Sequence, residues 1–168
     1  INYLYNRNIF KIDGKILDKI YSNNPALKSF QIKRIYPNTL KIKFIKSKPI
    51  AKIYINNKIK YLGDNGKVFQ VDEKKNSIPS ILGENDIQKI LEVFKLIKSS
   101  SFDIQNIKNI KIYPTKRFDL ILQDKTIIKF PIKTNQRTIK KAYYFLINHQ
   151  AELSSIDLRL PNRIIIND

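Results

Sequence analysis

The chain has 168 residues, of which 42% are hydrophobic and 11% aromatic, and it contains no cysteine and one histidine. This length and composition allow one domain with a sizeable core or two small ones, and they exclude a globally disordered chain. Without cysteine, the chain has no disulfide, thiolate metal site or cysteine nucleophile. With His149 as the single histidine, a histidine metal cluster is excluded and a serine hydrolase triad has little to draw on.

The charge is strongly basic, with 32 Lys and Arg against 14 Asp and Glu and a formal net charge of +18. Such an excess is typical of proteins that bind nucleic acid or anionic lipid. Here the lysines are spread through every segment instead of gathering in blocks with interleaved aromatic residues. We interpret most of them as solvated surface and expect no nucleic-acid partner; a basic nucleic-acid-binding domain stays the alternative.

The first predicted element is a short amphipathic helix within residues 11–25, "KIDGKILDKIYSNNP". Asp13 suits the N-cap and Pro25 follows the end. The apolar positions at helical spacing are Ile16, Leu17, Ile20 and Tyr21.

A β-hairpin is predicted next, because apolar and polar residues alternate on both sides of Pro37-Asn38 in residues 30–44. With a period of two, one face is apolar and the other presents Lys41 and Lys43 to water. The residues that we expect to face a core are Leu40, Ile42 and Phe44.

A domain boundary is predicted near residue 50, because Pro49 cannot donate to a ladder and is typical of a strand start or edge. Beyond it, two turn signals, Asn56-Asn57 and Asp64-Asn65-Gly66, predict a meander of short strands. Residues 76–86, which contain Pro79 and Gly83, are predicted to be irregular.

The rest of the chain predicts two helices and five strands. The first helix begins after Asn85 or Asp86, and three strands follow in residues 102–114 and 117–131. The second helix has His149 near its end in a capping or surface role, and two short strands bent at Pro161-Asn162 close the chain. The apolar stripes of the helices are Ile87, Ile90, Leu91, Phe94 and Ile97, and Ile139, Ala142, Tyr143, Leu146 and Ile147.

The acidic residues do not indicate a catalytic centre. Four of them are crowded in sequence but fall in predicted turns and loops, where we interpret them as solvated and not as a glycosidase pair or a metal site. Asp157 and Arg159, two apart on a predicted strand, can form a surface ion pair. We therefore expect no catalytic residue, metal site or cofactor, and no enzyme. The crowded carboxylates are Asp64, Asp72, Glu73 and Glu84.

Four motifs follow one another along the chain. The first joins the proline-ended helix to the turn Tyr36-Pro37-Asn38-Thr39-Leu40 and the exit Lys48-Pro49-Ile50-Ala51. The second and third are "YLGDNGKVF" and "IPSILG", and the fourth is "SIDLRLPNRIIIND", which contains Ile156-Asp157-Leu158-Arg159. In this order the motifs resemble the POTRA domain and the following β domain of the bacterial cell-division proteins FtsQ and DivIB.

The resemblance implies an α+β fold. A truncated POTRA domain without its first strand would occupy residues 1–50, and a mixed β-sheet domain flanked by helices would occupy residues 51–168. It further implies a non-catalytic divisome scaffold that bridges division proteins during septum formation. Its partners would be FtsB- and FtsL-like proteins, with other division proteins at the POTRA domain.

The resemblance also implies a location. Family members are single-pass proteins of the inner membrane, with this region in the periplasm or otherwise outside the membrane. The anchoring helix is expected to lie outside this chain, in which no run of about 18 apolar residues occurs.

The partner-binding region implied by the resemblance falls on the last strand pair. The mechanism would be β-augmentation, in which the free N–H and C=O groups of a sheet edge pair with an incoming strand. We predict that residues 163–167 form this exposed edge, and that proline at Ile165 abolishes binding of an FtsB-like segment. A buried final strand, and a POTRA module of an outer-membrane assembly factor, are the alternatives. The expected binding residues are Arg159, Leu160, Asn162, Arg163, Ile164 and Ile166.

Overall fold

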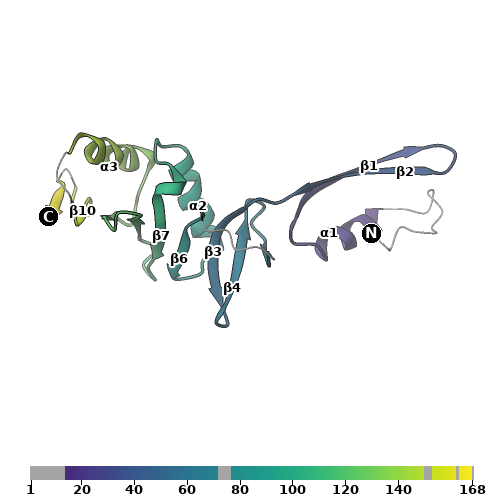
Figure 1. Cartoon of the computed structure of the whole chain (residues 1–168), viewed down its shortest axis with the longest axis horizontal. Helices are drawn as coiled ribbons and strands as arrows, with labels where there is room; N and C mark the ends of the chain where they lie inside the picture. Colours follow the sequence, from purple (N-terminus) through teal and green to yellow (C-terminus); the bar gives the residue numbers. More distant parts are fainter. Residues whose placement is uncertain (1–13, 72–76, 150–152, 162, 168) are drawn as a thin grey trace.

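The structure is a computed structural model that describes residues 14–71, 77–149, 153–161 and 163–167. The molecule is elongated, with a hairpin near its N-terminal end and the last two strands at the other end (Figure 1). Four residues considered above lie outside the described residues: Asp13, Asp72, Glu73 and Asn162.

The N-terminal part confirms the predicted helix and hairpin. Helix α1 spans Gly14–Ser22, and it is followed by strands β1 (Leu27–Ile35) and β2 (Thr39–Lys46). The two strands form a separate antiparallel sheet in which Phe30 pairs with Phe44 and Ile32 with Ile42. The alternation of the sequence therefore places these apolar residues on one face.

The apolar face of the hairpin is less buried than predicted. Leu40 and Ile42 are half-buried, and Phe44 is 37% exposed, so the prediction that Phe44 faces a core is wrong. Helix α1 has nine residues, about 13 Å of rise, and its Tyr21 packs on Phe30 with ring centroids 6.4 Å apart. One short helix cannot cover the full length of two strands of nine and eight residues.

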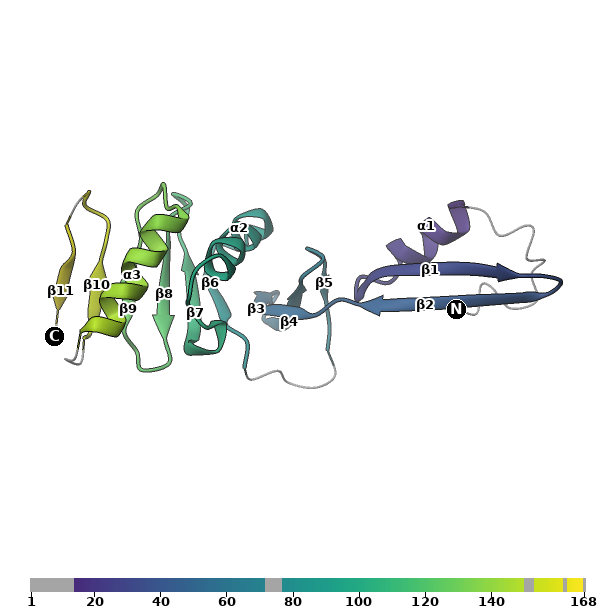
Figure 2. The same cartoon turned by 90° about the horizontal axis from the view of Figure 1, so that it is seen from above.

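The rest of the chain forms one mixed sheet of nine strands, with the order β11-β10-β9-β8-β7-β6-β3-β4-β5. Figure 2 shows the strands side by side along the molecule. The predicted meander, the three strands of the middle segment and the closing pair are confirmed. The elements are β3 (Pro49–Ile55), β4 (Lys58–Gly63), β5 (Val68–Phe69), β6 (Ser80–Gly83), α2 (Ile87–Lys98), the 3₁₀ turn η3 (Ile104–Asn106), β7 (Ile107–Ile112), β8 (Phe118–Leu122), β9 (Ile127–Lys129), α3 (Gln136–Asn148), β10 (Ser155–Asp157) and β11 (Ile165–Asn167).

Strand β6 corrects the prediction that residues 76–86 are irregular. It lies between β3 and β7, parallel to both, and Ile81 is buried at 2% exposure. Pro79 precedes the strand and Gly83 ends it, so the two residues that suggested a loop delimit a short buried strand. Both neighbours come from distant parts of the sequence, which is why local pattern did not reveal it.

Helices α2 and α3 cover the same face of the large sheet (Figures 1 and 2). Asp86, one of the two predicted caps, accepts a hydrogen bond from Lys89 N and begins α2, and Asn135 caps α3 in the same way. Beneath the helices, Phe118 and Phe130 stack with centroids 5.0 Å apart. The predicted stripe of α3 is correct for buried Ile139 and Ala142 but wrong for Ile147, which is 56% exposed. At 3.6 residues per turn, Ile147 is rotated by about 80° from Ile139 around the helix axis.

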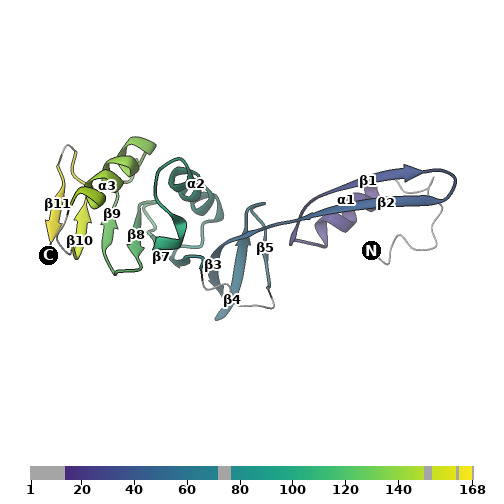
Figure 3. The same cartoon turned by 45° about the horizontal axis from the view of Figure 1, so that its top comes forward.

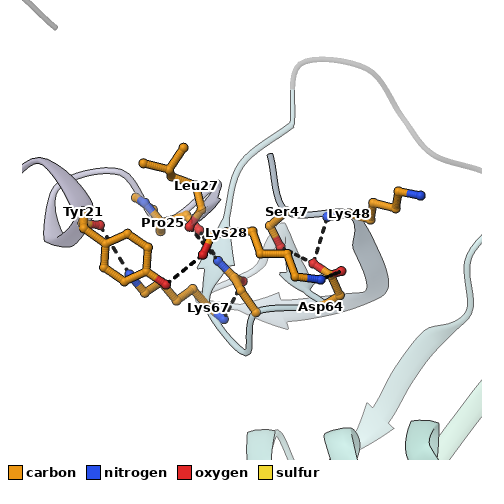
Figure 4. A network of polar contacts seen from close by, with 9 residues as sticks. Tyr21, Pro25, Leu27, Lys28, Ser47, Lys48, Asp64 and Lys67 are labelled. Atoms are coloured by element: carbon orange, nitrogen blue, oxygen red, sulfur yellow. Dashed lines mark hydrogen bonds and ion pairs between the residues drawn. The ribbon is translucent and has the colours of Figure 1, made fainter. Parts of the chain in front are cut away.

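A polar network joins the hairpin to the large sheet (Figure 4). Asp64, in the turn after β4, accepts hydrogen bonds from Lys28 Nζ (2.7 Å), Ser47 Oγ (2.8 Å) and Lys48 N (3.1 Å). The next residue, Asn65, donates to the carbonyl groups of Pro25 and Leu27 at 2.9 and 3.1 Å. One turn of the large sheet therefore contacts both the strand pair and the chain that follows α1.

The pKa of Asp64 reflects this network. Burial raises the pKa of the carboxyl group, but the hydrogen bonds from Lys28, Ser47 and Lys48 outweigh it and hold the pKa below its ordinary value. A carboxyl group whose pKa is lower in the folded state stabilises that state above its ordinary pKa. The contribution is lost as the pH falls through the lowered value.

We expect Asp64→Asn to lower the free energy of unfolding by about 1 kcal/mol at pH 7, since Lys28 is half exposed and its ion pair is screened by solvent. The difference in the free energy of unfolding between variant and wild type should persist down to about pH 4. It should disappear at lower pH, where Asp64 becomes protonated. Urea unfolding at a series of pH values measures this. Asp18→Asn, which changes an exposed carboxylate of α1, is the matched control; a pH-independent gap for Asp64→Asn would contradict the assignment.

Candidate partner-binding edge

Strand β11 is the last strand of the large sheet and borders solvent (Figure 3). Its three residues are exposed, with Ile165 at 45% and Ile166 at 38%. The strand begins two residues later than predicted, and Ile164, which precedes it, is half-buried and packs against the core. A buried final strand, the alternative considered above, is therefore excluded.

The hydrogen bonds of β10 decide which backbone groups of β11 point outward. Ile127 N donates to Ser154 O (3.1 Å), and Leu158 N donates to Lys129 O (2.9 Å). Ser154 O and Leu158 N, which flank β10, thus point to β9, and Ile156 between them has the same phase. Ser155 and Asp157 face β11, because the backbone groups of successive residues point to opposite sides of a strand. Their partners there are Asn167 and Ile165.

Ile166 lies between these two paired residues, so its N–H and C=O point away from the sheet. The prediction that Ile165 offers its N–H to an incoming strand is therefore wrong by one residue: this N–H faces β10. The error arises because the N–H groups of successive strand residues point to opposite sides, and the sequence does not reveal which residues of β11 pair with β10.

The far end of β11 is held by side chains as well as by the ladder. Asn167 O accepts hydrogen bonds from Ser154 N (2.9 Å) and Ser154 Oγ (3.1 Å), and Asn167 Nδ2 donates to Ser155 Oγ (3.0 Å). These contacts fix a very short strand in place. An edge held in this way presents its free backbone groups in a defined geometry.

The ion pair predicted from sequence spacing is present beside the edge. Arg159 Nε lies 2.9 Å from both carboxylate oxygens of Asp157, and Arg159 Nη2 lies 2.6 Å from Oδ2. The side-chain hydrogen bond from Arg159 holds the pKa of Asp157 below its ordinary value, and Lys129 contributes in the same direction. Since Arg159 is exposed, the pair orients its guanidinium more than it stabilises the fold.

A row of alternating charges crosses the face of the sheet opposite the helices. Lys111 pairs with Asp119, Asp119 with Lys129, and Lys129 with Asp157, which in turn faces Ile165 of β11. Their neighbours Ile110, Ile112, Leu120, Ile128 and Ile156 are buried under the helices. Because side chains alternate between faces, the charged row belongs to the open face and runs to the edge strand.

Asp119 is the buried member of this row, at 3% exposure. It accepts a hydrogen bond from the Tyr113 hydroxyl (2.9 Å), and its Oδ1 lies 3.5 Å from Arg117 Nη1. The Arg117 guanidinium also lies over the Tyr113 ring, 4.0 Å from its centroid. Tyr113, Arg117 and Asp119 thus form one polar cluster on the open face.

The structure brings most of the predicted binding residues together around β11. Arg159, Leu160 and Arg163 are exposed in the connection between β10 and β11, Ile164 is half-buried, and Ile166 lies on the edge. Sequence reasoning missed the charged row, since its members are far apart in the chain. An alternation of Lys or Asp with Ile in strands β7 to β10 was the available signal.

The described residues include neither a metal site nor a membrane-spanning helix. Among them, no group of His, Asp and Glu could hold a metal ion; Asp64 lies in the turn after β4 and Glu84 in the connection after β6. His149 ends α3 and stacks on Phe145 with centroids 5.0 Å apart. No helix within this part of the chain is long and apolar enough to cross a membrane.

Comparison with known families identifies the family of this chain. Residues 53–159 match the family model described as cell division protein FtsQ/DivIB, C-terminal. The chain belongs to the FtsQ/DivIB family. This assignment confirms the resemblance of the four motifs and sets aside the outer-membrane assembly factor.

Two individual FtsQ/DivIB relatives are similar to the chain. The cell division protein FtsQ of Blochmanniella floridana is 26% identical over 151 residues, which cover 80% of this chain and 51% of that protein. The chain thus spans about half the length of this curated relative. The major extracytoplasmic domain of the trans isomer of DivIB from Geobacillus stearothermophilus has a TM-score of 0.45 and 17% identity, covering 64% of this chain and 99% of that one.

Proposed function

We propose that this FtsQ/DivIB chain is a non-catalytic scaffold of the divisome that binds FtsB- and FtsL-like partners by strand addition at β11. The scaffold would bridge early and late division proteins during septum formation. Family membership supports the role in cell division. The exposed edge supports the mode of binding.

The observation that carries the proposal is the outward N–H and C=O of Ile166 on an exposed edge strand. An incoming strand gains main-chain hydrogen bonds from these groups, while alternate side chains supply specificity. Ile165 would lie on the open face beside the charged row, and Ile166 on the opposite face. Arg159, Leu160 and Arg163 border the same edge and would contact what flanks the added strand.

The test is Ile166→Pro, which removes the outward N–H without removing a bond to β10; proline is tolerated at such an edge position. We expect affinity for a synthetic FtsB-like segment to fall by roughly tenfold or more, measured by isothermal titration calorimetry. Ile166→Val retains the N–H and a β-branched side chain, so it should bind nearly as the wild type does.

A folded Ile166→Pro variant that binds the segment with unchanged affinity would refute strand addition at β11. Ile165→Pro provides a second comparison, because it removes the N–H that faces β10 and should weaken β11 itself. Amide hydrogen exchange of Asn167 and Asp157 separates the two cases: protection is retained in Ile166→Pro and reduced in Ile165→Pro.

The same proposal includes the division into domains and the location. We propose that residues 1–50 belong to a POTRA domain and residues 51–168 to the β domain, with the hairpin contacting other division proteins. The two separate sheets that meet between β2 and β3 support this division. Location in the inner membrane, with this region outside it, follows from the family and is proposed on that ground.

A further inference from the structure

A groove of about 590 Å³ lies on the helix side of the large sheet, between the start of α3 and the connection from β10 to β11. We call it the basic groove and define it by four cationic residues: Lys133, Arg137, Lys141 and Arg163. The partly apolar wall includes Leu158 and Leu160. Its size is that of a cleft that holds a small ligand or a short peptide segment.

The positive charge of the basic groove is not neutralised within the described part of the chain. Arg159, which also lines the groove, is engaged by Asp157. None of the four defining cations forms an ion pair with a described carboxylate, and all four are exposed. No acidic residue of the described part of the chain lines the groove. Like charges held around one hollow raise the local potential and attract an anion.

The first turn of α3 adds to this potential. Asn135, which caps the helix and accepts from Thr138 N at 3.0 Å, lines the groove together with Thr138. The N-terminal end of a 13-residue helix carries partial positive charge. Arg137 and Lys141, one turn apart, also border a second hollow with Lys140.

The basic groove adjoins the edge strand, because Arg163 precedes β11 by two residues. We propose that the groove binds an acidic peptide segment, rich in Asp or Glu, that continues from a strand added at β11. The inference rests on the proposed function, because the acidic segment is taken to continue from the strand added at β11. The cations of the basic groove are, however, independent of the backbone groups of Ile166. The contacts would be carboxylates on the four cations, with an apolar side chain against Leu158 and Leu160.

The shape of the basic groove favours a peptide over an anionic membrane surface. Its cations come from the segment before α3, from α3 and from the β10–β11 connection, and they surround a hollow. A flat lipid surface meets protruding cations, whereas an extended peptide fits into a groove and places alternate side chains on its walls.

The test compares two charge-matched triple variants of the full chain. Lys133→Gln, Arg137→Gln and Lys141→Gln remove three charges from the groove, and Lys33→Gln, Lys41→Gln and Lys43→Gln remove three exposed charges from the hairpin. The probe is a fluorescent oligoglutamate peptide, with oligoglutamine as its neutral counterpart, followed by fluorescence anisotropy. We expect the groove variant to lose about tenfold in affinity for oligoglutamate, and the hairpin variant to stay within about twofold of the wild type.

Equal losses in the two triple variants would overturn the proposal, because general charge would then explain binding. Loss of binding to phosphatidylglycerol vesicles in the groove variant, with oligoglutamate affinity unchanged, would overturn it in favour of a membrane contact. Ile166→Pro separates the inference from the proposed function: this variant should bind oligoglutamate as the wild type does, even if strand addition at β11 fails.

Discussion

Replacing Gly83 with alanine is expected to lower the free energy of unfolding by about 4 kcal/mol. Gly83 ends β6 with a φ of +82°, and a methyl group there would overlap the carbonyl oxygen of Ile112. That oxygen accepts a hydrogen bond from Glu84 N at 3.0 Å, so the two backbones cannot separate without losing it. The variant therefore combines an unfavourable φ with a steric clash between adjacent strands in the middle of the sheet.

Gly66→Ala is the matched control for this prediction. Its φ of +75° is similar, but among the described residues the added methyl group would meet only the side chain of Leu91, at 3.3 Å. A side chain can shift where a neighbouring strand cannot, so we expect a loss of about 1 kcal/mol from the backbone conformation alone. Urea unfolding followed by circular dichroism measures both. Similar losses in the two variants would show that the close approach to Ile112 is unimportant.

The second large effect is expected for Asp119→Ala, a loss of about 3 kcal/mol in the free energy of unfolding. The change leaves the Tyr113 hydroxyl without its acceptor and the nearly buried Arg117 without its ion-pair partner. It also removes the negative charge between Lys111 and Lys129 in the row. Breaking a buried pair costs more than the pair contributes, because one charge is left desolvated.

A double variant distinguishes this explanation from simple loss of packing. Replacing Asp119 and Arg117 together by leucine removes both charges, and we expect most of the lost stability to return. Thermal unfolding of Asp119→Leu, of Arg117→Leu and of the double variant completes the cycle. Additive losses would mean that Asp119 and Arg117 do not depend on each other.

The local elements of this FtsQ/DivIB chain were predictable because their signals lie within a few residues. Asp86 marks the start of α2, and alternation marks β1 and β2. Asn56 and Asn57 turn the chain between β3 and β4 with φ values of 50° and 59°, as short hairpin turns require. The spacing of Asp157 and Arg159 likewise predicted their ion pair. The four ordered motifs were sufficient to predict the family.

Contacts between distant segments were decided by the tertiary structure. Strand β6 forms because β3 and β7 lie on either side of it, and the exposure of Phe44 and Ile147 depends on how the surrounding elements pack. The same holds for the candidate edge. The sequence indicated an apolar closing strand, but only the pairing of β9, β10 and β11 determines that Ile166, and not Ile165, turns its backbone outward. A one-residue change of register exchanges the two, and register depends on partners far along the chain.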